Sequence, residues 1–152
     1  ETGVSIMYIE EELDAGDVIL KEYCEITEDD TLGTLHDKLK ELGAKGLGKT
    51  LKLIESGNVK AEKQDDAKAT FVKPISKEQS KIDWTDTKEN VYNKIRGLNP
   101  FPGAYTFNEK NENIKVYKGE KTDKVYDGEF GEIVEIINKK GLQKCSPFLI
   151  LL

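Results

Sequence analysis

The sequence predicts an incomplete α/β domain followed by a small β-barrel that is itself partly incomplete. Three observations predict this class. An apolar run over residues 4–9 is followed by an acidic, glycine-containing loop, as at the end of a strand in an open α/β sheet. Leucines then recur at helical spacing over residues 32–54. Several short strand candidates, separated by turn residues, follow residue 104.

The loop after the first predicted strand is the most informative segment of the chain. Residues 4–9 fit a mostly buried strand, and residues 18–26 continue as a second strand. Between them runs Leu13-Asp14-Ala15-Gly16-Asp17. Ligand sites of α/β sheets lie at strand ends, so we expect the chemistry near Asp14, although Asp-x-Gly sequences also make ordinary turns. A strand that opens at residue 4 has no preceding strand to pair with, which indicates a piece of a larger protein.

A long helix is predicted next. Asp30 or Thr31 can cap its first turn, and its apolar face is formed by Leu32, Leu35, Leu39, Leu42, Leu47, Leu51 and Ile54. Three glycines, at positions 43, 46 and 48, fall inside this pattern, and each costs roughly 1 kcal/mol relative to alanine in a helix interior. They predict either a break or close packing of the helix. Ser56-Gly57-Asn58 is a clear stop signal.

The chain then becomes polar, and we expect three parts: a first domain over 1–62, a linker over 63–80 and a second domain over 81–152. Trp84 is expected to anchor the core of the second domain. Asp86 can cap a short helix whose buried face carries Val91, Ile95 and Leu98. Strands are predicted at 104–107 and 114–117, with a hairpin formed by 132–137 and the residues from Leu142 onward.

Composition excludes some classes of protein. Hydrophobic residues make up 37% of the 152 residues, which is enough for a core. No stretch reaches the roughly 18 apolar residues that cross a bilayer. A cytoplasmic location is therefore the default expectation. Cys24 and Cys145 lack metal or redox spacing, and the single histidine, His36, is interpreted as a partly exposed helix residue. We expect no metal site. Residues 1–62 hold 15 acidic and 7 basic side chains, whereas 63–152 hold 14 and 16, so the second part is better suited to a polyanion.

Three segments carry a family resemblance: Leu13–Asp17, then Ile82-Asp83-Trp84, then Ile95-Arg96-Gly97-Leu98-Asn99-Pro100-Phe101-Pro102-Gly103-Ala104. With them, the chain resembles the bacterial methionyl-tRNA formyltransferases over essentially its whole length. The resemblance implies a Rossmann-like catalytic domain followed by an OB-like barrel. It also implies transfer of a formyl group from 10-formyltetrahydrofolate to the amino group of methionyl initiator tRNA, in translation initiation.

The resemblance also assigns residues. Asp14 matches the catalytic aspartate, while the family's Asn-x-His segment has no counterpart in this chain. We therefore expect the chain alone to be inactive. Separately, we expect the full-length protein to be monomeric. The folate pocket would include Glu12, Leu13, Asp14, Gly16 and Asp17, with the role of Asp17 left open. Candidates for tRNA contact are Lys73, Lys77, Lys81 and Arg96. Arg96 could equally brace the turn that follows it.

Alternatives remain open for the end of the chain and for its function. Residues 141–149 depart from the family pattern, so either the chain is truncated or a segment is missing between Lys144 and Phe148. A sugar-nucleotide formyltransferase would share the folate chemistry and a related second domain. A third hypothesis is that the chain, as it stands, binds RNA without catalysis.

Overall fold

The computed structural model describes residues 1–122, 127, 129–137, 140–144 and 149–151. The chain divides into two compact units. Unit 1 comprises residues 1–28 and 34–73, and unit 2 comprises residues 29–33 and 74–152. The last boundary between the two units along the chain, between Lys73 and Pro74, falls within the predicted linker of 63–80.

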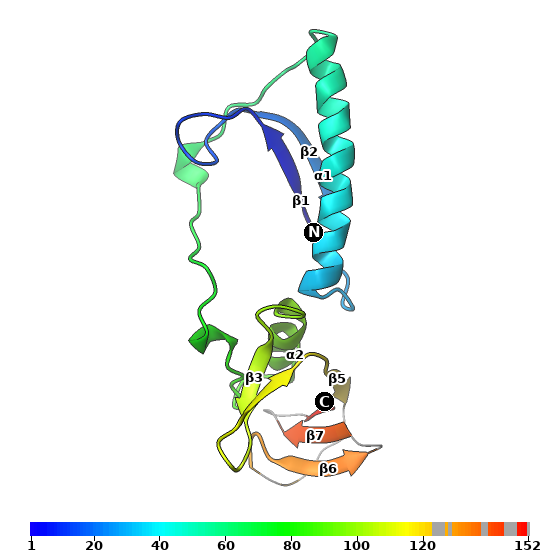
Figure 1. The fold of residues 1–152 in the computed structure, drawn as a ribbon, viewed down its shortest axis with the longest axis vertical. Helices are drawn as coiled ribbons and strands as arrows, with labels where there is room; N and C mark the ends of the chain where they lie inside the picture. Colours follow the sequence, from blue (N-terminus) through cyan, green and yellow to red (C-terminus); the bar gives the residue numbers. More distant parts are fainter. Residues whose placement is uncertain (123–126, 128, 138–139, 145–148, 152) are drawn as a thin grey trace. The chain divides into compact units, whose positions relative to one another are not determined.

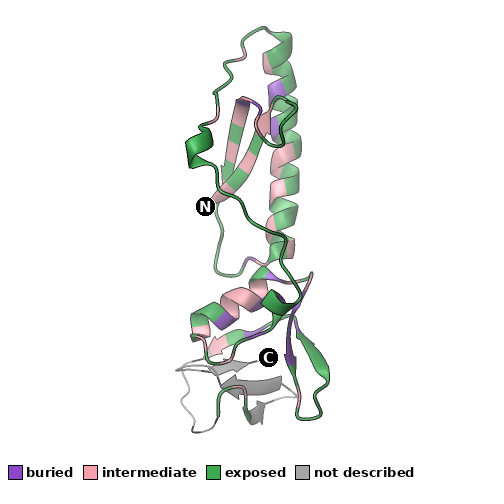
Figure 2. Cartoon of the chain, turned by 90° about the vertical axis from the view of Figure 1, so that its left-hand side faces the viewer, coloured by how far each residue is buried: buried purple, intermediate pink, exposed green. Residues whose placement is uncertain are grey.

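Unit 1 contains a β-hairpin. Strand β1 (Thr2–Met7) pairs antiparallel with β2 (Val18–Cys24), and the acidic loop joins them (Figure 1). Intermediate and exposed residues alternate along most of β1, so the prediction of a mostly buried strand is wrong (Figure 2). The reason is that helix α1 (Leu32–Glu55) packs against one side of the hairpin, and alternate side chains of a strand point to opposite faces.

Helix α1 runs without a break for 24 residues, so the glycines mark close packing. Gly46 is buried, and a Cβ at this position would lie 2.7 Å from Cδ1 of Ile6 on β1. The stop signal is confirmed. Gly57 has a φ of +69°, its N–H donates to the carbonyl of Ile54, and the N–H of Asn58 donates to that of Leu53. These two bonds form a Schellman motif, which satisfies carbonyls at the helix end.

Unit 2 is built around a short helix, α2 (Lys88–Gly97). The predicted face of Val91, Ile95 and Leu98 is confirmed, because all three are buried in one cluster with Ile82, Ala104 and Val116. Thr87, one residue beyond the predicted Asp86, is the N-cap, and its Oγ1 accepts from the N–H of Asn90 at 3.2 Å. Trp84 packs against this core, and its Nε1 donates to Thr106 Oγ1 at 2.9 Å.

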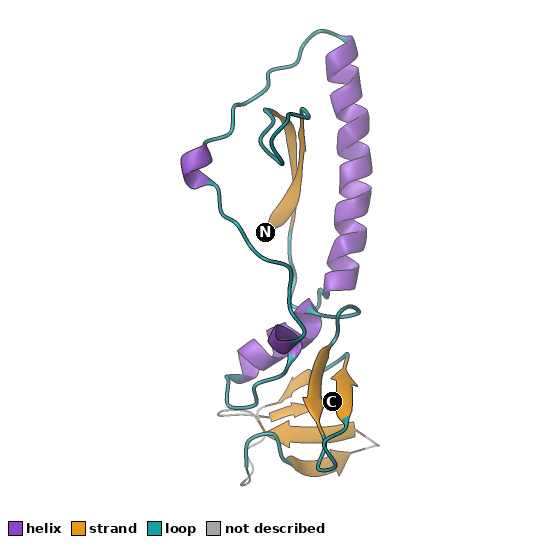
Figure 3. Cartoon of the chain, turned by 60° about the vertical axis from the view of Figure 1, so that its left-hand side comes forward, coloured by secondary structure: helices purple, strands orange, loops and turns teal. Residues whose placement is uncertain are grey.

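The strands of unit 2 form two small antiparallel sheets (Figure 3). The first pairs β3 (Ala104–Phe107) with β4 (Asn113–Val116). The second has the order β5-β8-β7-β6, with β5 at Glu120–Thr122, β6 at Ile133–Ile137, β7 at Lys140–Lys144 and β8 at Leu149–Leu151. The predicted hairpin is confirmed by the pairing of β6 with β7. Cys145 and the segment proposed as missing between Lys144 and Phe148 lie outside the described residues.

Candidate functional site

The loop between β1 and β2 is held by contacts of its own backbone. The N–H of Tyr8 donates to the carbonyl of Asp17 at 3.1 Å, which closes the base of the loop. Gly16 is buried there, and a Cβ at this position would lie 1.8 Å from the carbonyl oxygen of Tyr8. Only glycine permits this approach of two backbone segments. Asp14 has a φ of +58°, in the left-handed region that aspartate tolerates better than most residues.

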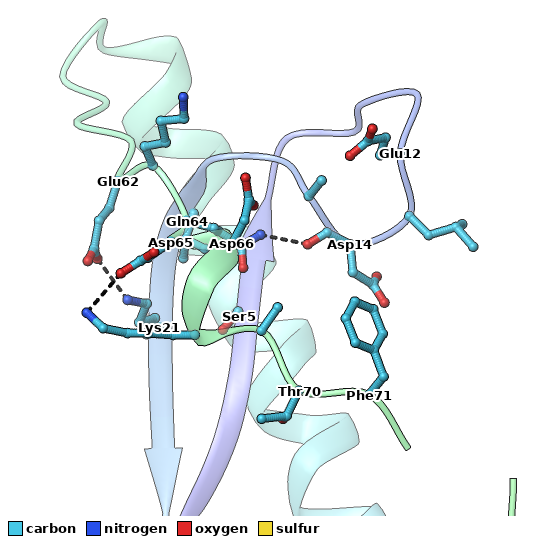
Figure 4. A pocket seen from close by; sticks show the side chains of 16 residues that line it. Ser5, Glu12, Asp14, Lys21, Glu62, Gln64, Asp65, Asp66, Thr70 and Phe71 are labelled. Atoms are coloured by element: carbon cyan, nitrogen blue, oxygen red, sulfur yellow. Dashed lines mark hydrogen bonds and ion pairs between the residues drawn. The ribbon is translucent and has the colours of Figure 1, made fainter. Parts of the chain in front are cut away.

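A side chain from a distant part of the chain also holds the loop. Nε2 of Gln64 donates to the carbonyl of Asp14 and to the carbonyl of Gly16, each at 2.7 Å, and lies 3.8 Å from Sδ of Met7. The carbonyl of Asp14 faces Gln64, whereas its carboxylate points away from it (Figure 4). No local signal in the sequence points to Gln64, because its partners lie about 50 residues earlier in the chain.

The position of Gln64 follows from a short backbone pairing. Glu62 and Val18 exchange two hydrogen bonds of 2.8 Å in an antiparallel bridge, so residue 64 lies next to the loop that precedes β2. Lys21 Nζ contacts Glu62 Oε2 at 2.8 Å beside the bridge. This hydrogen bond, with the attraction between the charges, raises the pKa of Lys21 above its usual value and lowers the pKa of Glu62.

A cavity of about 710 Å³ opens beside the loop (Figure 4). Glu12, Leu13 and Asp14 line it from the loop, and Gln64 and Phe71 line it from the segment that follows α1. The side chains of Leu13 and Phe71 are almost fully exposed, at 96% and 95%. The cavity therefore combines carboxylates with uncovered apolar surface. A short 3-10 helix, Asp66–Lys68, forms part of its wall and is capped by Asp65, whose Oδ1 accepts from the N–H of Ala67 at 3.1 Å.

The predicted folate residues do not all face this cavity. Glu12, Leu13 and Asp14 line it, whereas Gly16 is a buried residue of the loop and Asp17 contributes a carbonyl to the loop closure. His36 is exposed on α1 next to Asp37, with 3.5 Å between Nδ1 and Oδ1. Among the described residues, no three His, Cys, Asp or Glu side chains are grouped to hold a metal ion.

The predicted tRNA residues are distributed over both units. Lys73 is exposed at the end of unit 1, and Lys77 and Lys81 are exposed in unit 2. Lys81 Nζ lies 5.5 Å from the centre of the Phe107 ring. Arg96 is half-buried and donates through Nε to Asn93 at 2.7 Å and through a terminal nitrogen to the carbonyl of Asp30 at 3.0 Å.

Comparison with known families accounts for most of the chain. Residues 74–152 match the family described as formyl transferase, C-terminal domain, and residues 1–51 match the family described as formyl transferase. The chain belongs to the formyl transferase family. Within the described part of this formyl transferase chain, no helix has the length and apolar character needed to cross a membrane.

Curated relatives of this formyl transferase chain come from several bacteria. The chain is 52% identical to a methionyl-tRNA formyltransferase of Fusobacterium nucleatum, over 93% of this chain and 46% of the relative. It is 44% identical to that of Bacillus subtilis, over 93% of this chain and 44% of the relative. The chain thus spans less than half the length of these relatives.

Solved structures show the same fold at low identity. HypX from Aquifex aeolicus, in complex with tetrahydrofolic acid, superposes with a TM-score of 0.79 at 18% identity, covering 98% of this chain and 26% of that one. An N-formyltransferase from Helicobacter canadensis, in complex with folinic acid and dTDP-3-aminofucose, gives a TM-score of 0.67 at 18% identity, covering 98% and 54%. The α/β formyl transferase fold predicted for the chain is confirmed.

Proposed function

We propose that the protein containing this chain transfers a formyl group from 10-formyltetrahydrofolate to the amino group of methionyl initiator tRNA, in the cytoplasm during translation initiation. The 52% identity with a methionyl-tRNA formyltransferase over 93% of the chain carries this proposal. The chain spans less than half of such relatives, so we propose that the transfer requires the full-length protein and that this chain alone is inactive.

Asp14 is the proposed catalytic residue. An amine that attacks a formyl group must lose a proton, and a carboxylate beside the reacting amine can accept it or hold a water that does so. Asp14 lines the cavity and is exposed, with its backbone fixed by hydrogen bonds on both sides of the loop. These features support a role in proton transfer. Asp17, whose carbonyl closes the loop, is proposed to act as a structural residue.

The cavity has groups that suit a folate. When bound, 10-formyltetrahydrofolate would supply the activated formyl group. Leu13 and Phe71 offer apolar surface for flat rings, and Glu12 offers a carboxylate that can accept hydrogen bonds from a pterin edge. Gly16 allows the backbone of the loop to keep its compact form behind these residues. The two solved structures named above are complexes with folate compounds, which supports a folate-derived donor.

Unit 2 is the proposed tRNA-contacting part, and we propose that it forms an OB-like barrel. Lys77 and Lys81 are exposed and can contact phosphates, as can Lys73 at the end of unit 1. Arg96 is proposed to act mainly as a brace, because its guanidinium donates to Asn93 and to the carbonyl of Asp30. Residues 63–152 hold 16 basic and 14 acidic side chains, against 7 and 15 in residues 1–62, so the proposed contacts lie in the less acidic part of the chain.

Formyl transfer by the intact protein tests the proposal. Asp14→Asn should reduce kcat by roughly 10²–10⁴-fold, the usual contribution of a positioned acid or base. Asp37→Asn, at an exposed position of α1, is the matched control and should stay within about twofold of the unchanged protein. The 152-residue chain alone should show no transfer. Full activity of Asp14→Asn would remove the proposed role of this residue.

The acceptor is tested separately. Proteins described as sugar N-formyltransferases share the fold at 18–22% identity, which is the observation that keeps an amino-sugar nucleotide as the second candidate acceptor. Intact protein is supplied with either methionyl initiator tRNA or a dTDP-amino sugar. Transfer to the sugar nucleotide without transfer to the tRNA would overturn the tRNA assignment, while folate-dependent chemistry at Asp14 would stand.

A further inference from the structure

We propose that Gln64 is a positioning residue that sets the orientation of Asp14 in the reaction. This inference rests on the proposed function, because it assigns a role to a residue beside the same site. Gln64 lies outside both segments that match the formyl transferase families, which cover residues 1–51 and 74–152. A glutamine side chain carries no charge, so its role depends on hydrogen-bond geometry.

The direction of the Gln64 amide is determined by its partners. The two close partners are carbonyl oxygens, of Asp14 and of Gly16, and both lie 2.7 Å from Nε2, while the sulfur of Met7 lies farther away at 3.8 Å. A carbonyl can only accept, so the –NH₂ end of the glutamine must face them. Its two hydrogens are then both used. The half-buried amide cannot rotate without giving up both of these hydrogen bonds to the loop.

One of these two hydrogen bonds is made to Asp14, whose backbone is in the left-handed region. Asp14 has a φ of +58°, and a non-glycine residue in this region needs support from its surroundings. Gln64 supplies that support from one side, at the carbonyl of Asp14 itself, while the carboxylate points away from Gln64 (Figure 4). The backbone of Asp14 fixes the direction of its Cα–Cβ bond, and hence the region that its carboxylate can reach, and Gln64 holds that backbone.

A separate anchor keeps Gln64 in place. The two hydrogen bonds between Glu62 and Val18 pair the segment with β2, and the ion pair of Lys21 with Glu62 lies at the same point. In an antiparallel pairing with 62 opposite 18, residue 64 comes opposite residue 16, which is one of its two acceptors. The register of this pairing thus places the side-chain amide of Gln64 next to the loop.

The test uses three variants of the intact protein. Gln64→Glu keeps the length of the side chain but, when ionised, has no hydrogen to donate, and Gln64→Ala removes the group altogether. Gln79→Ala is the matched control, since the side chain of Gln79 is exposed, lies outside the cavity and accepts from the N–H of Ser76. We expect both Gln64 variants to lower kcat at least ~10-fold with KM for the folate changed less than about threefold, and the control to stay within about twofold.

A cycle with Asp14 separates positioning from a general structural role. If Gln64 acts through Asp14, the double variant Asp14→Asn, Gln64→Ala should be no slower than Asp14→Asn alone. Multiplied losses would overturn the proposal. Hydrogen exchange of the amides of residues 12–16 should also speed up at least ~10-fold in Gln64→Ala and remain unchanged in Gln79→Ala. Unchanged exchange would overturn the proposal. This readout does not depend on activity, so a failure of the intact protein to formylate tRNA would count against the proposed function alone.

Discussion

A single glycine decides whether the candidate site can form. A Cβ at Gly16 would lie 1.8 Å from the carbonyl oxygen of Tyr8. Neither atom could move aside as the end of a flexible side chain would, because the Cβ is fixed to the backbone and the carbonyl is part of it. Gly48 gives the opposite case within the same unit, because a Cβ there meets nothing within 4 Å. Two glycines that look alike in the sequence therefore have different consequences for stability.

We expect Gly16→Ala to lower the free energy of unfolding by about 1–3 kcal/mol, the usual cost of forcing extra volume into a filled space. Gly48→Ala should raise it by about 0.5–1 kcal/mol, because alanine loses less conformational freedom in a helix interior. Urea unfolding of the intact protein measures both. Equal effects of the two substitutions would contradict the close contact between Gly16 and Tyr8.

Among the elements, the caps define where helices begin and end. Helix α2 begins at Lys88 because Thr87 accepts the N–H of Asn90, while Asp86 instead accepts from the N–H of Thr87 and from the side chain of Asn90. Helix α1 ends in the Schellman bonds of Gly57 and Asn58. In both cases the polar groups at the helix end determine the boundary more closely than the apolar spacing does.

Removal of the cap on α2 tests this point. Thr87→Ala should lower the free energy of unfolding of the unit by about 1 kcal/mol, because the N–H of Asn90 loses its acceptor. Thr87→Ser keeps a hydroxyl and should stay within about 0.5 kcal/mol of the unchanged protein. Thermal or urea unfolding of the intact protein provides the measurement, and an equal decrease in both variants would show that the methyl group matters more than the cap.

Over the chain as a whole, the distribution of lysine bears on the proposed binding of tRNA. Substitution of Lys73, Lys77 or Lys81 by glutamine should weaken tRNA binding in each case. It should also reduce the slope of log K against log salt by about 0.7–0.9 for each phosphate that is no longer neutralised. Lys52→Gln, at an exposed position of α1, is the control and should leave the slope unchanged. Slopes that stay constant in all four variants would remove these lysines from the interface.

The outer face of α1 bears on the behaviour of the chain on its own. Leu47, Leu51 and Ile54 recur at helical spacing and are 50%, 53% and 44% exposed. Exposed apolar side chains grouped on one face favour association in water. We expect the isolated chain to self-associate with rising concentration in sedimentation experiments, and Leu51→Lys to reduce this. A monomer at all concentrations would show that these exposed side chains do not drive association.

Local patterns in the sequence were sufficient for most elements. The spacing of leucines predicted α1, the stop signal predicted its end, and Val91, Ile95 and Leu98 predicted the buried face of α2. These signals are readable because helix periodicity and capping act between residues at most a few positions apart. The loop with Asp14 was identified in the same way, from a strand followed by acidic residues and glycine.

Contacts between distant segments could not be predicted. Sequence patterns alone established most of the elements, the resemblance of the chain to a formyltransferase and the place of Asp14 in the loop. The folded structure was needed to show that Gln64 holds the carbonyls of Asp14 and Gly16, that Gly46 marks close packing on β1 instead of a helix break, and that Arg96 reaches the carbonyl of Asp30. The difference arises because such contacts depend on how separate segments meet in space. The hydrophobic periodicity of one segment does not indicate which other segment it contacts.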